Sequence, residues 1–508
     1  LPLMYCHAKL KNISQHTVIS AHLFLPDYSP MNRDSFYPAI ACFPLLLMLA
    51  GCAPMHETRQ ALSQQTPAAQ VDTALPTALK NGWPDSQWWL EYHDNQLTSL
   101  INNALQSAPD MQVAEQRIQL AEAQAKAVAT QDGPQLDFSA DMERQKMSAE
   151  GLMGPFALND PAAGTTGPWY TNGTFGLTAG WHLDIWGKNR AEITARLGTV
   201  KARAAEREQT RQLLAGSVAR LYWEWQTQAA LNTVLQQIEK EQNTIIATDR
   251  QLYQNGITSS VEGVETDINA SKTRQQLNDV AGKMKIIEAR LNALTNHQTK
   301  SLKLKTVALP KVASQLPDEL GYSLLARRAD LQAAHWYVES SLSTIDAAKA
   351  AFYPDINLMA FLQQDALHLS DLFRHSAQQM GVTAGLTLPI FDSGRLNANL
   401  DIAKAESNLS IASYNKAVVE AVNDVARAAS QVQTLAEKNQ HQAQIERDAL
   451  RVVGLAQARF NAGLIAGSRV SEARIPALRE RANGLLLQGQ WLDASIQLTG
   501  ALGGGYKR

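Results

Sequence analysis

The stretch TFGLTAGWHLDIWGK, residues 174–188, contains the change of periodicity that decides the fold. Apolar residues stand at every second position from Phe175 to Ile185, which is typical of a strand with one apolar and one polar face. After Gly187 the alternation ends. At 1.5 Å per residue, the roughly 65 proline-free residues that follow would form a helical rod on the order of 100 Å long. A rod of that length is not a helix of a globular core.

The same transition occurs a second time in VTAGLTLPIFDSGRL, residues 382–396, which indicates an internal duplication. The first landmarks, Asp110 and Pro134, recur 220 positions later as Asp330 and Pro354. Later landmarks recur at an offset of 207: Gly187, Val218-Ala219-Arg220 and Gly256 as Gly394, Val425-Ala426-Arg427 and Gly463. The change of offset predicts a net insertion of 13 residues in a loop between Pro134 and Gly187.

Each repeat is predicted to contain a helix, a strand hairpin and a long helical hairpin. In repeat one, residues 96–297, the first helix spans 96–129, the strand hairpin about 135–186 and the helical hairpin about 188–297. In repeat two, residues 318–497, the corresponding ranges are 318–351, about 355–391 and about 395–497. A linker over 298–317 joins the repeats and a tail over 498–508 follows them. Gly256 and Gly463 are expected to form the turns at the tips of the helical hairpins.

The apolar face of the first hairpin is predicted to contact lipid, because its strands have about the 9 to 11 residues that cross a bilayer when tilted. A half-buried hairpin in a soluble sandwich has the same periodicity. The expected lipid-facing residues are Phe175, Leu177, Ala179, Trp181 and Leu183. Four strands cannot close a barrel and an open edge cannot lie in lipid, so several copies would have to share one barrel.

The first fifty residues indicate export and lipidation. Residues 1–30 lack the order of a signal peptide and are taken as an unfolded upstream extension, whereas residues 31–51 have a positive start and an apolar run that ends at Leu-Ala-Gly before Cys52. The box resembles a bacterial lipoprotein cleavage site, with Cys52 as the lipidated residue; a plain secretory signal is the alternative. Residues 52–95 would form an N-terminal equatorial segment.

Several functional classes are excluded by composition and motif content. The net charge of −2 leaves no basic excess for binding nucleic acid. All three cysteines lie in the first tenth of the chain, and no phosphate loop, metal-ligand spacing or nucleophile motif occurs. We therefore expect no enzymatic activity, no metal and no cofactor.

The duplicated order of strand and helical hairpins, together with several motifs, resembles the TolC-like outer-membrane factor family over residues 52–508. It is most similar to the lipidated branch that serves efflux pumps. The motifs are Trp88-Trp89 with Asp94, Ala108-Pro109-Asp110, Arg327-Arg328-Ala329-Asp330-Leu331, Ala351-Phe352-Tyr353-Pro354, Leu388-Pro389-Ile390-Phe391 with Gly394-Arg395, and Ala501-Leu502-Gly503-Gly504-Gly505. Ala329 and Tyr506 depart from the usual proline and tryptophan, and Pro476 interrupts the last helix.

The resemblance implies a mixed α and β membrane protein that forms a homotrimer. Four strands per chain would give a twelve-stranded barrel in the outer membrane, and the long helices would form an α-barrel in the periplasm. The implied function is a passive export duct for drugs or other small toxic compounds. Its implied partners are further copies of the chain, a periplasmic adaptor, an inner-membrane pump and outer-membrane lipid.

The resemblance also implies a gate at the closed end of the duct, where the family commonly has acidic residues beyond the second tip glycine. Counting six and nine positions beyond each tip glycine gives Glu262 and Glu265 in repeat one, and Arg469 and Glu472 in repeat two. Arg469 would pair with Glu472 or with a carboxylate of the neighbouring tip and hold the tips closed. An ordinary solvated ion pair, worth ~0 to 1 kcal/mol, is the alternative.

Two further functional classes compete with the duct: a periplasmic adaptor lipoprotein and a structural coiled-coil lipoprotein of the envelope. An adaptor would carry one helical hairpin and compact soluble β domains. The duplicated hairpins and amphipathic strands of this chain favour the duct.

Overall fold

The computed structural model describes residues 55, 61–65, 82–148, 150, 169–257, 259–296, 302–311 and 321–506. All elements discussed below belong to the unit that runs from Ala53 to Arg508. Cys52 and the signal segment predicted before it lie outside the described residues, as do half of the linker and most of the predicted equatorial segment before Gly82.

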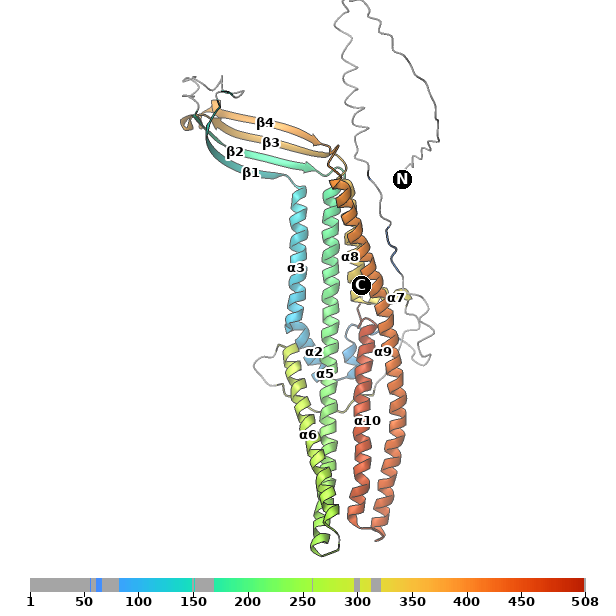
Figure 1. Ribbon diagram of the computed structural model, residues 1–508. Coiled ribbons are helices and arrows are strands. Elements are labelled where there is room, and N and C mark those ends of the chain that lie inside the picture. The colour runs from blue at the N-terminus through green and yellow to red at the C-terminus, as the bar shows by residue number, and fades with distance from the viewer. Residues whose placement is uncertain are drawn as a thin grey trace, which may run out of the picture. The chain divides into compact units, whose positions relative to one another are not determined.

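The strands form one antiparallel sheet whose spatial order is the order of the sequence (Figure 1). Its strands are β1 (Gln135–Lys146), β2 (Trp169–Leu183), β3 (Asp355–Ala366) and β4 (Gln378–Thr387). The two hairpins predicted from the two repeats are joined through the pairing of β2 with β3. Consequently β1 and β4 are the two edges of the sheet.

The register places most apolar residues of the four strands on one face of the sheet, whereas Met359 and Phe361 of β3 lie on the other. Across one row Phe138 faces Leu177, Leu177 faces Leu362, and Leu362 faces Met380. In the adjacent row, whose side chains point to the opposite face, Asp137 of β1 lies beside Thr178 of β2. Because side chains alternate between the faces of a sheet, the predicted strand periodicity gives one apolar and one largely polar surface.

Eight α-helices of the described chain carry the rest of the fold. In repeat one they are α2 (Asn95–Ser107), α3 (Pro109–Ala129), α5 (Lys188–Gln254) and α6 (Ser260–Leu294), and a 3-10 helix, η1 (Trp88–Tyr92), precedes them. In repeat two they are α7 (Gly321–Arg327), α8 (Ala329–Ala350), α9 (Arg395–Asn461) and α10 (Gly467–Ala501). None of the helices in the described ranges is both long enough and apolar enough to cross a membrane.

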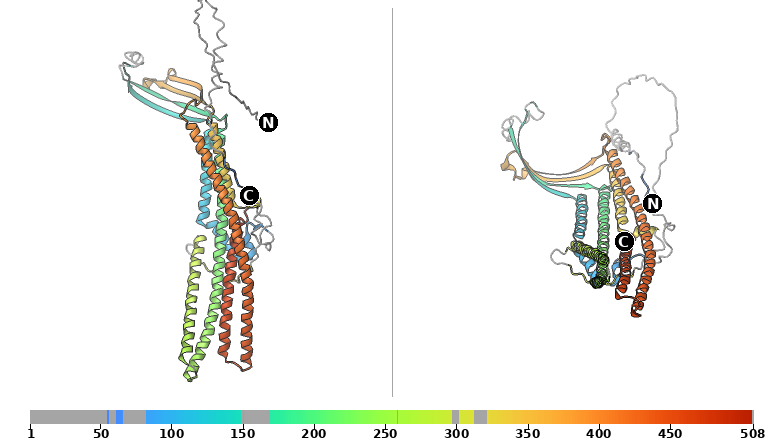
Figure 2. Two further views of the ribbon diagram at one scale, coloured as in Figure 1. Left: turned by 45° about the vertical axis from the view of Figure 1, so that its right-hand side comes forward. Right: turned by 60° about the horizontal axis from the view of Figure 1, so that its bottom comes forward.

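The helices follow the same lateral order as the strands to which they connect. Figures 1 and 2 show α3 and α6 nearly end to end beside α5, and α8 and α10 nearly end to end between α5 and α9. In the two regions where one helix ends and the next begins, the Ser107 hydroxyl donates to the Thr295 carbonyl, and the Arg328 guanidinium donates to the Ala501 carbonyl. The helical layer therefore has two open edges, as the sheet does.

The first helix of each repeat, predicted to be continuous over 96–129 and 318–351, is broken in the structure. In repeat one Ala108 is extended, with φ −62° and ψ 136°, and Pro109 begins α3. Proline drives the preceding residue out of the helical region, so the break follows from the sequence. In repeat two Arg328 is extended before Ala329, and its guanidinium makes two hydrogen bonds to Asp330. Pro476, in contrast, lies within α10 without ending it.

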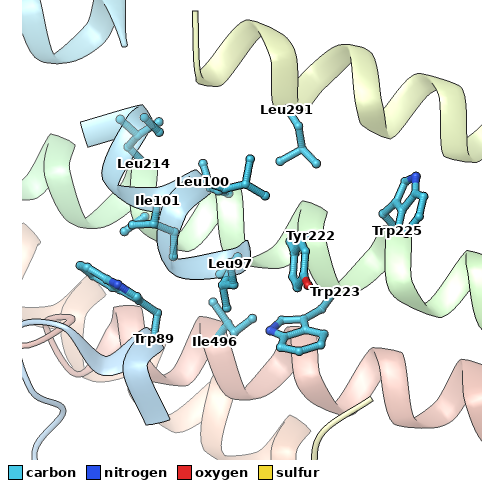
Figure 3. Packing of buried hydrophobic residues seen from close by; sticks show 14 of the residues in the cluster. Trp89, Leu97, Leu100, Ile101, Leu214, Tyr222, Trp223, Trp225, Leu291 and Ile496 are labelled. Atoms are coloured by element: carbon cyan, nitrogen blue, oxygen red, sulfur yellow. The ribbon is translucent and has the colours of Figure 1, made fainter. Parts of the chain in front are cut away.

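The largest core cluster lies where α2, α5, α6 and α10 meet (Figure 3). Tyr222 and Trp223 of α5 are buried there, and the Tyr222 hydroxyl donates to the Asp94 carboxylate at 2.7 Å. Asp94 also accepts from the first backbone N–H groups of α2, so the Trp88-Trp89 and Asp94 motif fixes the start of that helix against α5. These aromatic residues serve helix packing.

Candidate functional site

The two hairpin tips have the same backbone geometry. The Gly256 N–H donates to the Tyr253 carbonyl and the Ile257 N–H to the Leu252 carbonyl, each at 2.9 Å. In the second tip Gly463 donates to Phe460 and Leu464 to Arg459, at 2.8 and 2.9 Å. This is the double hydrogen bond of a Schellman motif, and it needs the positive φ values of 66° and 74° that the two glycines adopt.

Both tips expose apolar side chains. Ile257 is 67% exposed and Leu464, its equivalent 207 positions later, is 72% exposed. Tyr253 and Phe460, at the ends of the preceding helices, are exposed as well. In a Schellman motif the residue after the glycine usually packs against its own helix. Here these side chains are exposed instead, so they are available for contacts beyond the protomer.

The predicted gate residues of repeat two contact one another. Arg469 Nη1 donates to Glu472 Oε2 at 2.7 Å, three positions along α10, and the side chains are 67% and 41% exposed. The Glu472 hydrogen bond and charge raise the pKa of Arg469, and the more distant charges of Asp249 and Glu262 act in the same direction. The cation thus lies in an acidic field that includes carboxylates of α5 and α6.

The gate residues of repeat one are less connected. Glu262 and Glu265 are both exposed on the first turns of α6. Glu262 contributes to the field around Arg469, whereas the described contacts of this tip join other residues: Arg250 with Asp267 at 3.9 Å, and Thr266 with Asp249 at 3.2 Å. The structure therefore brings Arg469, Glu472 and Glu262 into one electrostatic neighbourhood.

Arg474, which is not among the residues predicted from the sequence, connects the two helical hairpins. Its guanidinium lies 3.3 Å from Glu241 Oε1 of α5 and 3.2 Å from Gln457 Oε1 of α9. Glu241 is only 18% exposed. No local pattern points to the contact between Arg474 and Glu241, because these two residues are 233 positions apart and meet only through the packing of α10 against α5.

Ion pairs within the hairpins follow the duplication. Arg274 of α6 pairs with Glu239 of α5 at 3.0 Å, and 207 positions later Arg481 of α10 pairs with Glu446 of α9 at 3.2 Å. The same position in both repeats thus joins the outgoing and returning helix of one hairpin. These pairs hold each hairpin together, whereas Arg474 joins one hairpin to the other.

The predicted lipid-facing residues of β2 share the apolar face of the sheet. Their neighbours across the strands are apolar at most positions: Leu177 lies beside Leu362, Ala179 beside Ala360, and Leu183 beside Ile356. Leu177 and Trp181 are each 41% exposed. Within the described ranges no group of His, Cys, Asp and Glu side chains could hold a metal ion.

Comparison with known proteins gives a family match over most of the chain. The pattern of the family "Outer membrane efflux protein" matches residues 100–297 and 320–504. The multidrug resistance outer membrane protein MdtQ of Escherichia coli O157:H7 is 98% identical over 478 residues, which are 94% of this chain and 100% of that protein. The multidrug resistance outer membrane protein MdtP of Shigella flexneri is 36% identical over 466 residues, 91% of this chain and 94% of that protein.

Solved structures share the fold. The outer-membrane channel OprN has a TM-score of 0.76 at 21% identity, covering 88% of this chain and 98% of that one. The outer membrane protein VceC from Vibrio cholerae has a TM-score of 0.71 at 25% identity, covering 84% and 100%. The expected fold class, long helices with a β portion in a duplicated chain, is confirmed by these similarities.

Proposed function

Because the chain belongs to the outer membrane efflux protein family, we propose that it is the outer-membrane channel of an efflux system. In this role it is a passive duct through which drugs or other small toxic compounds leave the cell. The near identity to multidrug resistance outer membrane proteins supports this class of substrate. The adaptor and structural-spacer alternatives receive no comparable support.

The observation that carries the proposal is the matched order of strands and helices with open edges on both layers. Strand β1 runs away from α3 and β4 runs back towards α9, so β4 of one copy and β1 of the next can pair antiparallel. Three copies would close a twelve-stranded barrel and leave no edge in lipid. The apolar face would then contact lipid, with Phe175, Leu177, Ala179, Trp181 and Leu183 among its residues.

The polar face would line the duct. Asp137, Thr178 and Asp141 lie on it. A wet, mildly acidic wall lets solutes pass without binding them tightly, so selection falls to the other components of the system.

The exposed apolar tips support a partner in the periplasm. Ile257 and Leu464 follow the ends of α5 and α9, and Figure 1 shows these helix ends far from the sheet. A periplasmic adaptor coupled to an inner-membrane pump is the partner we propose for this end. Arg469, with Glu472 and Glu262, would hold the tips together until the adaptor separates them, and Cys52 would carry the lipid anchor.

The experiment that tests this function is deletion of the gene, alone and together with each candidate pump. Loss of the channel should raise intracellular accumulation of the exported compound, and complementation with the full chain should reverse it. Accumulation after loss of both channel and pump should be little higher than after either single loss, because both proteins act in one export route. Unchanged accumulation of every tested compound after channel loss would contradict the proposal.

A further inference from the structure

A pair of cations lies at the outer end of the apolar face of β1. Leu136, Phe138, Ala140 and Met142 share this face, and the next two residues on it are Arg144 and Lys146. The pairing of β1 with β2 runs without a bulge from Gln135 beside Gly180 to Lys146 beside Trp169, so the alternation of faces holds to the last residue. Both cations are exposed.

An apolar cover lies beside these cations on the same face of the sheet. It is formed by the connection between β3 and β4, because a Cβ placed on Gly173 would lie 2.9 Å from Leu372 Cδ1 and 3.0 Å from Leu369 Cδ2. The Phe373 ring packs on Phe175, with centroids 5.6 Å apart. Gly173 faces Met142 across the strands, so the cover adjoins the residue that precedes the cations on this face.

The cover exposes apolar surface next to the cations. Phe373 is 85% exposed and Leu369 is 50% exposed. Trp169, which faces Lys146, is 52% exposed. An exposed apolar patch bordered by cations fits an amphiphile better than a soluble partner, since one molecule can satisfy both surfaces.

Among the described residues, the charges nearby leave the two cations uncompensated on this face. Asp371 of the cover is already paired with Arg374 at 3.2 Å, and His368 lies 4.0 Å from it. Glu143 points to the opposite face of β1. Among the described residues neither Arg144 nor Lys146 forms an ion pair within 4.0 Å.

We propose that Arg144 and Lys146 bind the phosphate groups of a phosphorylated glycolipid in the outer leaflet, whose acyl chains lie against Leu369, Phe373 and the apolar face of β1. The inference rests on the proposed function, which puts the sheet end remote from the helices at the outer surface. Arginine matches phosphate geometry with two parallel N–H donors. Lysine extends its charge past an apolar stem to the headgroup level.

The test is a titration of the purified full-length oligomer in detergent with bisphosphorylated lipid A, with bound lipid counted by native mass spectrometry. The double variant Arg144→Gln with Lys146→Gln should bind about 30-fold more weakly, as expected for two cations at an anionic lipid surface. The matched control, Lys283→Gln with Lys285→Gln, removes two exposed cations with the same spacing from α6 and should bind as the unmodified chain does.

Dephosphorylated lipid A should bind the unmodified chain about as weakly as bisphosphorylated lipid A binds the double variant. Equal binding of the two lipids would overturn the site, and this arm remains decisive even if the double variant fails to assemble. Millimolar inorganic phosphate should not displace the lipid; displacement would mean a site for the free anion. The double variant should still conduct ions, so loss of lipid binding and loss of the channel are separate results.

Discussion

The Arg474 guanidinium of α10 lies 3.3 Å from the Glu241 carboxylate of α5 and so joins the two helical hairpins of one chain. Arg474 and its second partner, Gln457, are 207 positions beyond Asp267 and Arg250, whose side chains lie 3.9 Å apart. Repeat one thus has an ion pair within its hairpin where repeat two has an arginine and an amide. Because Gln457 does not neutralise it, the arginine of repeat two can also bind Glu241.

The Arg474→Ser substitution should loosen the second hairpin from the first and raise single-channel conductance. A partly exposed ion pair is worth ~1 kcal/mol, so the ratio of open to closed tips should rise about fivefold. The control is Arg481→Ser, which removes a pair inside one hairpin. An equal response to both substitutions would show that general weakening of α10, and not the link between hairpins, sets the conductance.

Replacing Arg469 by serine should increase both conductance and cation selectivity in planar bilayers. The change removes a cation from a neighbourhood that also contains Glu472 and Glu262. Stability should change by at most ~1 kcal/mol, because Arg469 is exposed and Glu472 is only half-buried. Unchanged conductance and selectivity in an assembled oligomer would mean that Arg469 and Glu472 form an ordinary solvated ion pair with no role in gating.

On β2, Leu177→Arg should impair assembly far more than Thr178→Arg. Leu177 lies on the apolar face and Thr178 on the opposite face of the same strand. An arginine at the bilayer midplane of a barrel costs about 2 to 4 kcal/mol, whereas one directed into an aqueous duct avoids this cost. Heat-resistant oligomer in outer-membrane fractions is the measurement, and equal yields would reject the assigned lipid face.

Labelled fatty acid should enter the unmodified chain and should be absent from the Cys52→Ala variant. The variant should keep most of its oligomer, because a closed barrel holds the chain in the membrane without a lipid anchor. Label that persists in Cys52→Ala would place the modification elsewhere.

Periodicity predicted the long rods and the strands well, because a helix of 67 residues and strands of 10 to 15 residues repeat one simple pattern many times. Pro109 also indicates a break in the helix predicted over 96–129, because proline disfavours a helical conformation in the residue before it. The break at Arg328 was not readable, because Ala329 favours a helix. It depends on Arg328 contacts with Asp330 and with the Ala501 carbonyl, and the latter is distant in sequence.

For the candidate site, the tip glycines were predictable because only a few residue types adopt a positive φ at a helix end. The Arg469–Glu472 contact was accessible for a similar reason, since three positions along a helix bring side chains together. Glu241 and Arg474 meet only after α10 has packed against α5, so no local pattern specifies their contact. Within the proposed gate, the Arg469–Glu472 pair is therefore predictable from sequence spacing, whereas the Glu241–Arg474 contact between the hairpins is not.

The measurement that tests the central claim most directly is single-channel recording of the purified full chain in planar bilayers, together with the mass of the same preparation. The account predicts an oligomer of three copies that gives discrete current steps, with larger steps when Arg469 and Arg474 are both replaced by serine. An assembled oligomer of three copies that passes no current, either unmodified or with both arginines replaced, would contradict it.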